Sequence, residues 1–492
     1  MNTSLRRLSV TFMALIVVLL LNATFTQVFR ADGLRSDPRN PRVLLDEYSR
    51  QRGQITAGGQ PIAFSKSTSG RFRYLRVYPE PLAYAPVTGF YSLNYSSSEL
   101  ERQEDSILNG SDERLFGQRL ADFFTGRDPR GGNVDTTIKP QVQQAAWEAM
   151  QKGCPSGPCK GAVVAIEPST GKILAMVSSP SYDPNRLASH DAATQAQAWK
   201  DFHDDPDNPT ANRAISERYP PGSTFKVITT AAALQAGATD QTQLTADPTI
   251  PLPDSTKQLE NYGGMRCDSG PTVPLKEAFA KSCNTAFVQL GLQIGADALR
   301  RTAQAFGLDT APSPIPLEVA ESTVGPIPDG AALGMSAIGQ KDVALTPLQN
   351  AMVAATVANR GSLMQPYLVD TLKGPDLAVL TTFQPHELRQ VVSQQVAAKL
   401  TELMIGAEQQ ALQKGAIPGV QIASKTGTAE NGTDPQNTPP HAWYIAFAPA
   451  QSPKVAVAVV IEHGGDLLDA TGGKLAAPVG RAVIAAALRE AS

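Results

Sequence analysis

The chain has 492 residues, of which 42% are hydrophobic and 18% are charged. This balance is typical of a folded globular protein and excludes a largely disordered chain, and the length suits two to four domains. The formal net charge is −3, which argues against a nucleic-acid partner.

The N-terminal stretch predicts a membrane anchor. Arg6 and Arg7 precede residues 8–29, an apolar run without charge that is long enough to span a bilayer. By the positive-inside rule, residues 1–7 form a cytoplasmic tail, and the remainder lies outside the plasma membrane as a single-pass protein. A cleaved signal peptide is the alternative, but residues 22–27 match its small-residue cleavage site poorly.

Residues 30–130 are expected to form a non-catalytic module in which no chemistry can be recognised. A Gly58-Gly59 turn between short apolar segments predicts a β-hairpin. Residues 71–78 and 90–93 alternate apolar and polar side chains as strands do. The segment 125–132 is rich in Gly, Pro and Arg and predicts the boundary with a second domain, residues 131–492.

The second domain has the pattern of an α+β fold. Residues 161–166 and 173–177 are two nearly continuous apolar strands joined by a turn, which predicts central strands of a covered sheet. Thr346 followed by Pro347 and, three residues after the cap, Gln349 predicts a helix that runs to about Asn359. Further strands are predicted at 420–423, 443–447 and 455–460, and a terminal helix at 477–489. Together they predict an antiparallel sheet with helices on both faces.

Residues 219–226, Tyr-Pro-Pro-Gly-Ser-Thr-Phe-Lys, are the chemically most informative stretch. The prolines and glycine stop any preceding helix, and the apolar segment 227–236 predicts a buried helix after Ser223. Ser223 and Lys226 are three residues apart and share one face, at the positive end of that helix, where a neutral lysine is favoured. Such a lysine can take the serine proton, which is the Ser-x-x-Lys signature of acyl-serine transferases. The alternative is a capped helix with a solvated lysine.

Two later motifs strengthen the catalytic interpretation. Ser282-Cys283-Asn284 presents a hydroxyl and an amide two residues apart, and Lys425-Thr426-Gly427-Thr428 reads as a strand. On that strand Lys425 and Gly427 should face one way and the two threonines the other. Taken singly, the first motif is common in turns and the second fits an edge-strand lysine. Found together in this order, they predict one cleft.

Amide cleavage assigns a role to each of these side chains. Ser223 is the nucleophile, and Lys226 is the base if a second cation lowers its pKa. Lys425 is that cation and attracts the carboxylate of a peptide substrate, with Thr426 and Thr428 as hydroxyl donors. Ser282 carries the proton between the lysine and the leaving nitrogen, and Asn284 holds a peptide group of the substrate.

The four cysteines are consistent with an extracytoplasmic location, where disulfides persist. Four cysteines allow three connectivities. A Cys154–Cys159 bridge would close the tight loop between these two residues, and it leaves Cys267 and Cys283 for each other. Zinc is the alternative, but the spacings match no finger or ribbon and the five histidines are scattered. No metal and no cofactor are expected.

In their order, the three motifs resemble those of the penicillin-binding proteins, over essentially the whole extracytoplasmic part. Further matches lie at 52–55, 161–165, 168–176, 180–185, 212–214 and 339–349 and at Trp443. These matches are similar to the monofunctional class B group, since about 100 residues between anchor and linker are too few for the glycosyltransferase domain of class A. Cys283 is a variant within the Ser-x-Asn motif that keeps both functional side chains.

The resemblance implies a D-alanyl-D-alanine transpeptidase fold and the same residue roles. It adds an oxyanion hole made by the backbone N–H groups of Ser223 and Thr428. The implied substrate is the D-Ala-D-Ala end of peptidoglycan stem peptides, cross-linked through an acyl-Ser223 intermediate at the division septum, and β-lactams would acylate the same serine. By the same likeness, the partners are a membrane glycosyltransferase and division proteins.

Two other functions stay open at this stage. A carboxypeptidase or β-lactamase would hydrolyse the acyl-enzyme, but no glutamate comparable to that of class A β-lactamases can be identified. A β-lactam sensor or a scaffold on the same fold is the non-enzymatic alternative. A sensor needs a cytoplasmic domain or several membrane spans, which seven residues before the apolar run do not supply.

Overall fold

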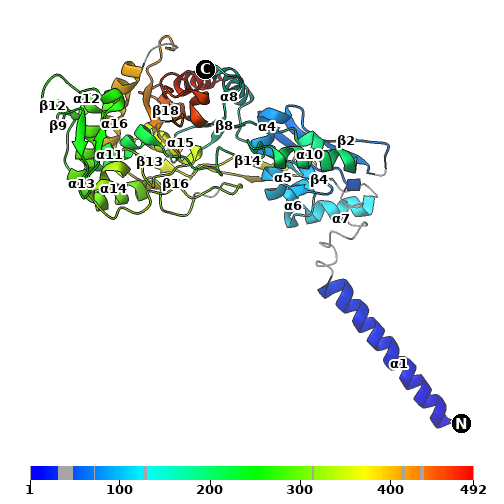
Figure 1. Ribbon diagram of the computed structural model, residues 1–492. Coiled ribbons are helices and arrows are strands. Elements are labelled where there is room, and N and C mark those ends of the chain that lie inside the picture. Colours follow the sequence, from blue (N-terminus) through cyan, green and yellow to red (C-terminus); the bar gives the residue numbers. More distant parts are fainter. Residues whose placement is uncertain are drawn as a thin grey trace.

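The computed structural model describes residues 2–30, 48–70, 72–125, 130–312, 315–411, 416–432 and 437–490. Two lobes lie side by side, with the N-terminal helix extending from the smaller lobe (Figure 1). The centre of the predicted linker, residues 126–129, lies outside the described residues.

The N-terminal helix α1 spans Asn2–Thr24 and continues into a short π-helical turn, Phe25–Phe29. Within it, Leu5–Val28 is long and apolar enough to cross a membrane, and it is the one such segment among the described residues. Its side chains are exposed, as expected of a helix that packs against lipid rather than protein. This helix is compatible with the predicted anchor.

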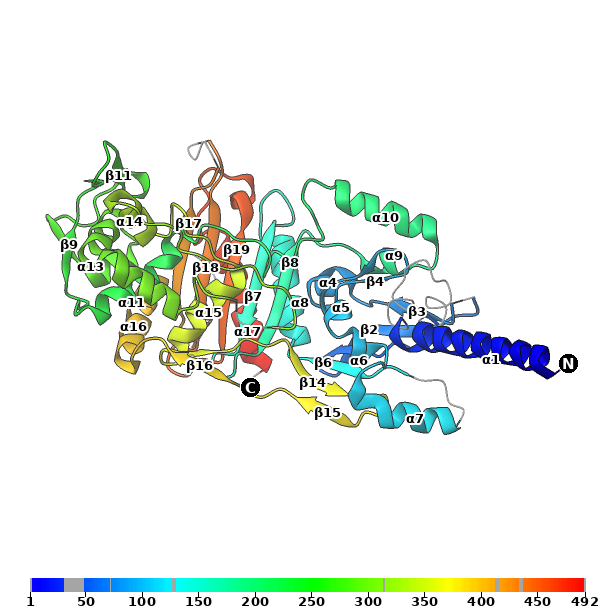
Figure 2. The same ribbon diagram turned by 90° about the horizontal axis from the view of Figure 1, so that it is seen from below.

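The smaller lobe is built on a six-stranded mixed sheet in the order β15-β14-β6-β1-β2-β3. The predicted hairpin at Gly58-Gly59 is present, because β1 pairs with β2 in antiparallel fashion. Helices α4, α5, α6 and α7 surround the sheet (Figure 2). The bounds are β1 Ile55–Ala57, β2 Gln60–Ser67, β3 Tyr74–Val77, β6 Asn133–Thr136, β14 Val369–Lys373, β15 Val379–Thr382, α4 Pro81–Thr88, α5 Glu99–Gln103, α6 Asp105–Leu108 and α7 Phe116–Thr125.

Three strands of this sheet come from beyond residue 130, where the sequence predicted the domain boundary. Strand β6 pairs in parallel with β1, and β14 pairs with β6 from more than 230 residues further along the chain. Helices α9 (Pro184–Ala188) and α10 (Ala192–Asp204) also lie on this side of the molecule (Figure 2). The smaller lobe is therefore assembled from separate parts of the chain, which no local sequence pattern indicates.

The larger lobe contains a five-stranded antiparallel sheet in the order β17-β18-β19-β7-β8. Its strands are β7 Gly161–Ile166, β8 Ile173–Ser179, β17 Ala423–Ala429, β18 His441–Ala448 and β19 Val455–Ile461. The strand predicted at 420–423 is misplaced, because Val420 follows a turn at 418–419 and β17 begins at Ala423. The Lys-Thr-Gly-Thr motif therefore occupies the middle of the outer strand.

Helices cover both faces of this sheet, as the α+β prediction requires. Helices α8 (Pro140–Lys152) and α17 (Ala476–Glu490) pack on one face, and α15 (Pro347–Ala358) packs on the other. Strand β7 serves both faces, since Val164 and Ile166 belong to the core on the α15 side and Val163 and Ala165 to the core on the α17 side.

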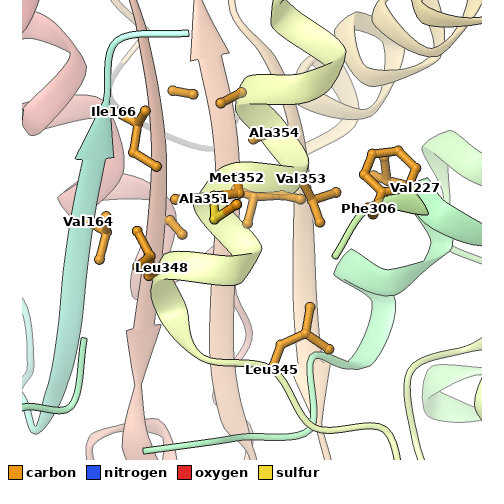
Figure 3. Close-up of a cluster of buried hydrophobic side chains, with 14 of the residues drawn as sticks. Val164, Ile166, Val227, Phe306, Leu345, Leu348, Ala351, Met352, Val353 and Ala354 are labelled. Atoms are coloured by element: carbon orange, nitrogen blue, oxygen red, sulfur yellow. The ribbon is translucent and has the colours of Figure 1, made fainter. Parts of the chain in front are cut away.

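Helix α15 is buried along its whole length and joins the sheet to the helical layer beyond it. Leu348 lies toward Val164 of β7, and Val353 lies on the opposite side toward Phe306 and Val227 (Figure 3). The predicted threonine cap is present, because Thr346 Oγ1 accepts a hydrogen bond from Gln349 N at 3.1 Å. This helix therefore fixes the helical layer, which carries Lys226, against the sheet.

Among the remaining elements, β4 and β5 belong to the smaller lobe, and the others form the helical layer and the loops of the larger one. These elements are β4 Tyr91–Ser92, β5 Ser96–Ser97, β9 Gln243–Thr245, β10 Thr249–Pro251, β11 Gln258–Glu260, β12 Thr272–Pro274, β13 Ser362–Met364, β16 Glu387–Gln390, α11 Lys226–Gln235, α12 Leu275–Ala280, α13 Asn284–Ala305, α14 Gly330–Ala337 and α16 Gln394–Ala411.

Candidate active site

Ser223 lies in a 3-10 turn, Gly222–Phe225, that leads directly into helix α11 at Lys226. Gly222 has φ +52°, and a Cβ at this position would lie 2.7 Å from Thr428 O. Only glycine allows this left-handed turn to lie against the strand at that distance. The backbone that carries Ser223 is therefore in direct contact with the outer strand β17.

Four hydrogen bonds fix the segment before Ser223. The backbone of Tyr219 pairs with Leu345 in both directions at 3.0 Å. Trp443 Nε1 donates to Pro220 O at 2.9 Å, and Gly222 N donates to Gly339 O at 2.9 Å. These partners come from two distant regions of the chain, residues 339–345 and Trp443, so the position of the serine depends on the tertiary fold rather than on the turn alone.

Lys226 is buried at the start of α11, and its Nζ points into the turn that carries Ser282. Nζ donates to Ser282 O and to Asn284 Oδ1, both at 2.8 Å, and lies 3.3 Å from Ser282 Oγ. Burial, and then the nearby charge of Lys425, hold the pKa of Lys226 well below its usual value. A neutral amine has two N–H donors for the two short bonds and one lone pair left to accept a proton.

Ser282 and Asn284 lie on either side of a tight junction between α12 and α13. Ser282 has φ +61°, a left-handed conformation that is uncommon outside glycine and asparagine. The intervening Cys283 is joined to Cys267 by a disulfide, and a second disulfide joins Cys154 to Cys159. The first bridge ties the Ser282–Asn284 junction to the loop that follows β11.

Lys425 reaches the same serine from the opposite side. Its Nζ lies 2.9 Å from Ser282 Oγ and 3.1 Å from Thr426 O, and the side chain is 1% exposed. Burial lowers the pKa of Lys425 to about 7. The Ser282 hydroxyl thus lies between two amines of lowered proton affinity, and it can accept from one while it donates to the other.

A cavity of about 570 Å³ opens in front of these groups. Among the residues that line it are Ser223, Ser282, Asn284, Thr426 and Thr428. The two lysines lie behind this wall rather than in it. Hydroxyl and amide groups therefore face the space that a substrate would occupy, with the buried amines one layer deeper.

Strand β17 alternates as the sequence predicts. Lys425 and Gly427 are buried, whereas Thr426 and Thr428 are partly exposed toward the cavity. A Cβ at Gly427 would lie 2.8 Å from Pro221 O and 2.9 Å from Trp443 Cβ. The glycine is therefore required for the close packing of β17 against the Ser223 turn.

A buried polar group beside the Ser223 segment escaped the sequence analysis. Glu462 Oε1 accepts from Tyr219 OH at 2.6 Å and from Arg213 Nε at 2.9 Å. His441 packs edge-on against the Tyr219 ring, and burial followed by the charge of His463 lowers the pKa of His441 to about 4. Tyr219 begins the Ser-x-x-Lys stretch, but nothing in the sequence indicates its partner 243 residues away.

No group of three or more potential metal ligands occurs among the described residues. The site itself presents the hydroxyls of Ser223, Ser282, Thr426 and Thr428 and the amide of Asn284, with two lysines of lowered pKa behind them. Ser223 at the wall of a substrate-sized cavity, three residues before a buried lysine of lowered pKa, is the arrangement of an acyl-serine enzyme.

The family comparison agrees with this class. Residues 161–485 match the penicillin-binding protein transpeptidase domain, and residues 52–134 match the penicillin-binding protein A dimerisation domain. The chain therefore belongs to the penicillin-binding protein transpeptidases. The predicted α+β fold and the predicted class of enzyme, a serine-type D,D-transpeptidase, are confirmed.

Within this family, the chain is similar over nearly its whole length to the mycobacterial PbpA proteins. The chain is 76% identical, over 100% of both chains, to the peptidoglycan D,D-transpeptidase PbpA of Mycolicibacterium smegmatis. It is also 76% identical to PbpA of Mycobacterium tuberculosis, over 99% of both chains. The ceftriaxone acyl-enzyme complex of penicillin-binding protein A from M. tuberculosis superposes with a TM-score of 0.90 and 75% identity, covering 90% of this chain and 100% of that one. The predicted resemblance to the class B group is confirmed.

Proposed function

We propose that this protein is a peptidoglycan D,D-transpeptidase that cross-links stem peptides through an acyl-Ser223 intermediate. The observation that carries the proposal is the Ser282 hydroxyl, which lies between Lys226 Nζ and Lys425 Nζ at the wall of the cavity that Ser223 lines. That arrangement supplies a nucleophile, a base and a proton path in one cleft.

Acylation begins at Ser223. Its Oγ attacks the carbonyl carbon of the penultimate D-Ala, and its proton passes to the lone pair of neutral Lys226 Nζ. The bond between Oγ and the carbonyl carbon forms as the peptide C–N bond breaks. The proton returns through Ser282 to the leaving nitrogen, so terminal D-Ala departs as a neutral amine and the ester remains on Ser223.

Deacylation repeats this path in reverse. An amine of a neighbouring stem peptide attacks the ester carbonyl and gives up a proton to Ser223 through the same lysine and serine. A new peptide bond forms as the ester bond breaks. A β-lactam enters the first half of this sequence, because its ring amide occupies the place of the scissile bond, and it then stays attached.

Substrate binding uses the groups that face the cavity. The hydroxyls of Thr426 and Thr428 donate to the terminal carboxylate, and Lys425 behind them supplies the attracting charge. Asn284 holds a peptide group of the stem. Gly427 lets the strand lie close to the Ser223 turn, and this closeness supports an oxyanion hole formed by the backbone N–H groups of Ser223 and Thr428.

The membrane placement is part of the same proposal. Residues 1–7 form a cytoplasmic tail, 8–29 the anchor and 30–130 a non-catalytic module, and the catalytic domain, 131–492, lies outside the cell membrane. The family likeness supports a role at the division septum, with a membrane glycosyltransferase and division proteins as partners. Retrieval of neither partner in a pull-down from detergent-solubilised membranes would contradict this assignment of partners.

The direct test is labelling of the full chain by a fluorescent penicillin, followed by intact-mass analysis and peptide mapping. We expect a single adduct on Ser223, none in Ser223→Ala, and release over hours. An adduct elsewhere would overturn the assignment of the nucleophile. Rapid turnover of the penicillin would indicate a hydrolase instead.

A further inference from the structure

Helix α15 carries three polar side chains, Gln349, Asn350 and Thr356, although it is buried along its whole length. A buried polar group costs free energy unless it is hydrogen-bonded. Thr356 bonds to a carbonyl of its own helix at 2.8 Å, and Gln349 Nε2 donates to Phe306 O at 2.8 Å. Asn350, which is 1% exposed, is directed instead at the turn that carries Ser223.

The partner of Asn350 is Thr224, the residue that directly follows Ser223. Asn350 Nδ2 donates to Thr224 Oγ1 at 3.0 Å, and Thr224 is fully buried. The same hydroxyl donates to Pro221 O at 2.9 Å. An amide nitrogen only donates, and a hydroxyl has a single proton. The bond from Asn350 therefore directs the Thr224 proton toward Pro221 O.

The Thr224 hydroxyl closes the turn around the proposed nucleophile. Pro221 and Thr224 flank Gly222 and Ser223, and they are joined twice. Thr224 N donates to Pro221 O at 3.3 Å, whereas the hydroxyl donates to the same oxygen at 2.9 Å. The backbone bond is longer than the usual range, so the hydroxyl supplies the better of the two closures. The backbone conformation of Ser223 therefore depends on this side chain.

Strand β17 packs on the same two residues. A Cβ at Gly427 would lie 2.8 Å from Pro221 O and 3.0 Å from Thr224 Cγ2. These two atoms thus form the surface that β17 needs in order to approach the turn. Through one hydroxyl, Asn350 connects the central helix α15 both to the nucleophile turn and to the strand that carries Thr428.

We propose that Asn350 is a positioning residue for acylation, which acts through the Thr224 hydroxyl to hold Ser223 in place for attack on the substrate carbonyl. This role rests on the proposed function of Ser223 as the nucleophile. Asn350 lies outside the lining of the cavity, so it has no part in holding the substrate. A displacement of the nucleophile slows attack strongly, because the reacting atoms must meet at short distance and in the right orientation.

The test is stopped-flow acylation of the full chain in detergent by a fluorescent penicillin, which yields the initial dissociation constant and the acylation rate constant separately. Asn350→Leu keeps the approximate size of the side chain and removes the donor. We expect the acylation rate constant to fall by about tenfold or more, while the dissociation constant stays close to that of the parent. A parent-like acylation rate in Asn350→Leu would overturn the positioning role.

Variants of the bonded partner show whether Asn350 acts through the hydroxyl. Thr224→Val removes the acceptor of the same bond and should slow acylation, whereas Thr224→Ser keeps the hydroxyl and should acylate much faster than Thr224→Val. In the double variant Asn350→Leu/Thr224→Val, acylation should be no slower than in Thr224→Val alone. Effects that multiply in the double variant would overturn the proposal, as would equal rates in Thr224→Val and Thr224→Ser.

Thr356→Val is the matched control, since it removes a buried hydroxyl further along the same helix. It should lower the melting temperature without a change in the acylation rate, and equal slowing in this variant would contradict a role specific to Asn350. If Asn350→Leu does not fold, Thr224→Val carries the test with Thr224→Ser as its rescue. Peptide mapping keeps the two proposals apart, because a parent adduct on a residue other than Ser223 would overturn the proposed function as well.

Discussion

The hydroxyl of Tyr219 donates a 2.6 Å hydrogen bond to the buried carboxylate of Glu462. Burial, and then the charge of Glu462, raise the pKa of Tyr219, so the tyrosine is the donor. Tyr219 opens the segment that ends at Ser223, and Glu462 directly follows the central strand β19. The bond therefore ties the segment that leads to Ser223, the proposed nucleophile, to the middle of the sheet.

We expect Tyr219→Phe to slow acylation more than it weakens the initial binding of a β-lactam. The ring still packs on Trp443 and His441, so the fold persists, but Glu462 loses one donor at a cost of about 1 kcal/mol. Stopped-flow acylation kinetics would separate the two effects. Tyr78→Phe is the matched control, since Tyr78 OH donates to buried Glu101 at 3.1 Å in the other lobe. Equal slowing by both variants would contradict a positioning role.

Replacement of Ser282 by alanine removes the hydroxyl between the two lysines. We expect the acylation rate to fall by about 10²-fold or more, because the proton can no longer pass from Lys226 to the leaving nitrogen. Thermal stability should change little, since the backbone carbonyl of Ser282 still accepts from Lys226. Ser255→Ala, at an exposed loop position, should be inert. An unaffected rate in Ser282→Ala would remove this serine from the proton path.

The decline of the acylation rate at alkaline pH should depend on whether the substrate carries a carboxylate. With a pKa of about 7, Lys425 is charged below neutral pH and loses its charge as the pH rises through 7. The second-order acylation rate for penicillin should therefore decline above pH 7. The methyl ester of the same penicillin has no carboxylate to attract and should lack this decline. Identical profiles for acid and ester would contradict the role of Lys425.

The substitution Gly427→Ala tests whether the site depends on the close contact between β17 and the turn that carries Ser223. The new Cβ would lie 2.8 Å from Pro221 O, so the strand must shift, at a cost of about 1–3 kcal/mol. We expect a lower melting temperature and a loss of penicillin labelling that exceeds the loss of folded protein. Gly406→Ala on α16 meets nothing within 4 Å and is the control. Full labelling in Gly427→Ala would show that the turn does not depend on this contact.

Neutral His441 should make the protein less stable in mild acid. Its pKa is about 4 in the folded state and about 6.5 when unfolded, so the unfolded chain binds more protons between these values. The free energy of unfolding should therefore fall as the pH drops from 6.5 to 4, by at most about 1.4 kcal/mol per pH unit from this residue. Urea denaturation should show a shallower pH dependence for His441→Gln. An unchanged slope in His441→Gln would contradict this account.

The proposed catalytic residues could be placed at one site from the sequence because each motif is local. The spacing of Ser223 and Lys226 survives in a 3-10 turn followed by an α-helix, and strand alternation placed Thr426 and Thr428 on the side that faces the cavity. A lowered pKa for Lys226 was expected if the lysine were buried beside Lys425, and burial is the larger of the two causes in the structure. These features need only helical or strand geometry and Coulomb's law.

The supporting contacts could not be predicted because they join distant parts of the chain. Lys226 bonds to the backbone of Ser282, and Lys425 reaches Ser282 rather than the open cavity. No sequence pattern indicates the hydrogen bond between Tyr219 and Glu462. The left-handed φ of Ser282 is likewise not indicated by the sequence. The strand predicted at 420–423 failed because apolar residues alone do not locate a turn at 418–419.

The hairpin β14–β15 has a mechanical consequence for the whole molecule. Because the larger lobe returns this hairpin to the sheet of the smaller one, β14 holds β6 in that sheet. After cleavage at residues 126–129, the part of the chain before the cut would stay bound to the rest by the β1–β6 ladder. A fragment that starts at residue 131 would expose β6 along the edge that β1 normally covers. Pulling force between bilayer and cell wall would thus be resisted by backbone hydrogen bonds rather than by a hinge, which keeps the cleft at a fixed height.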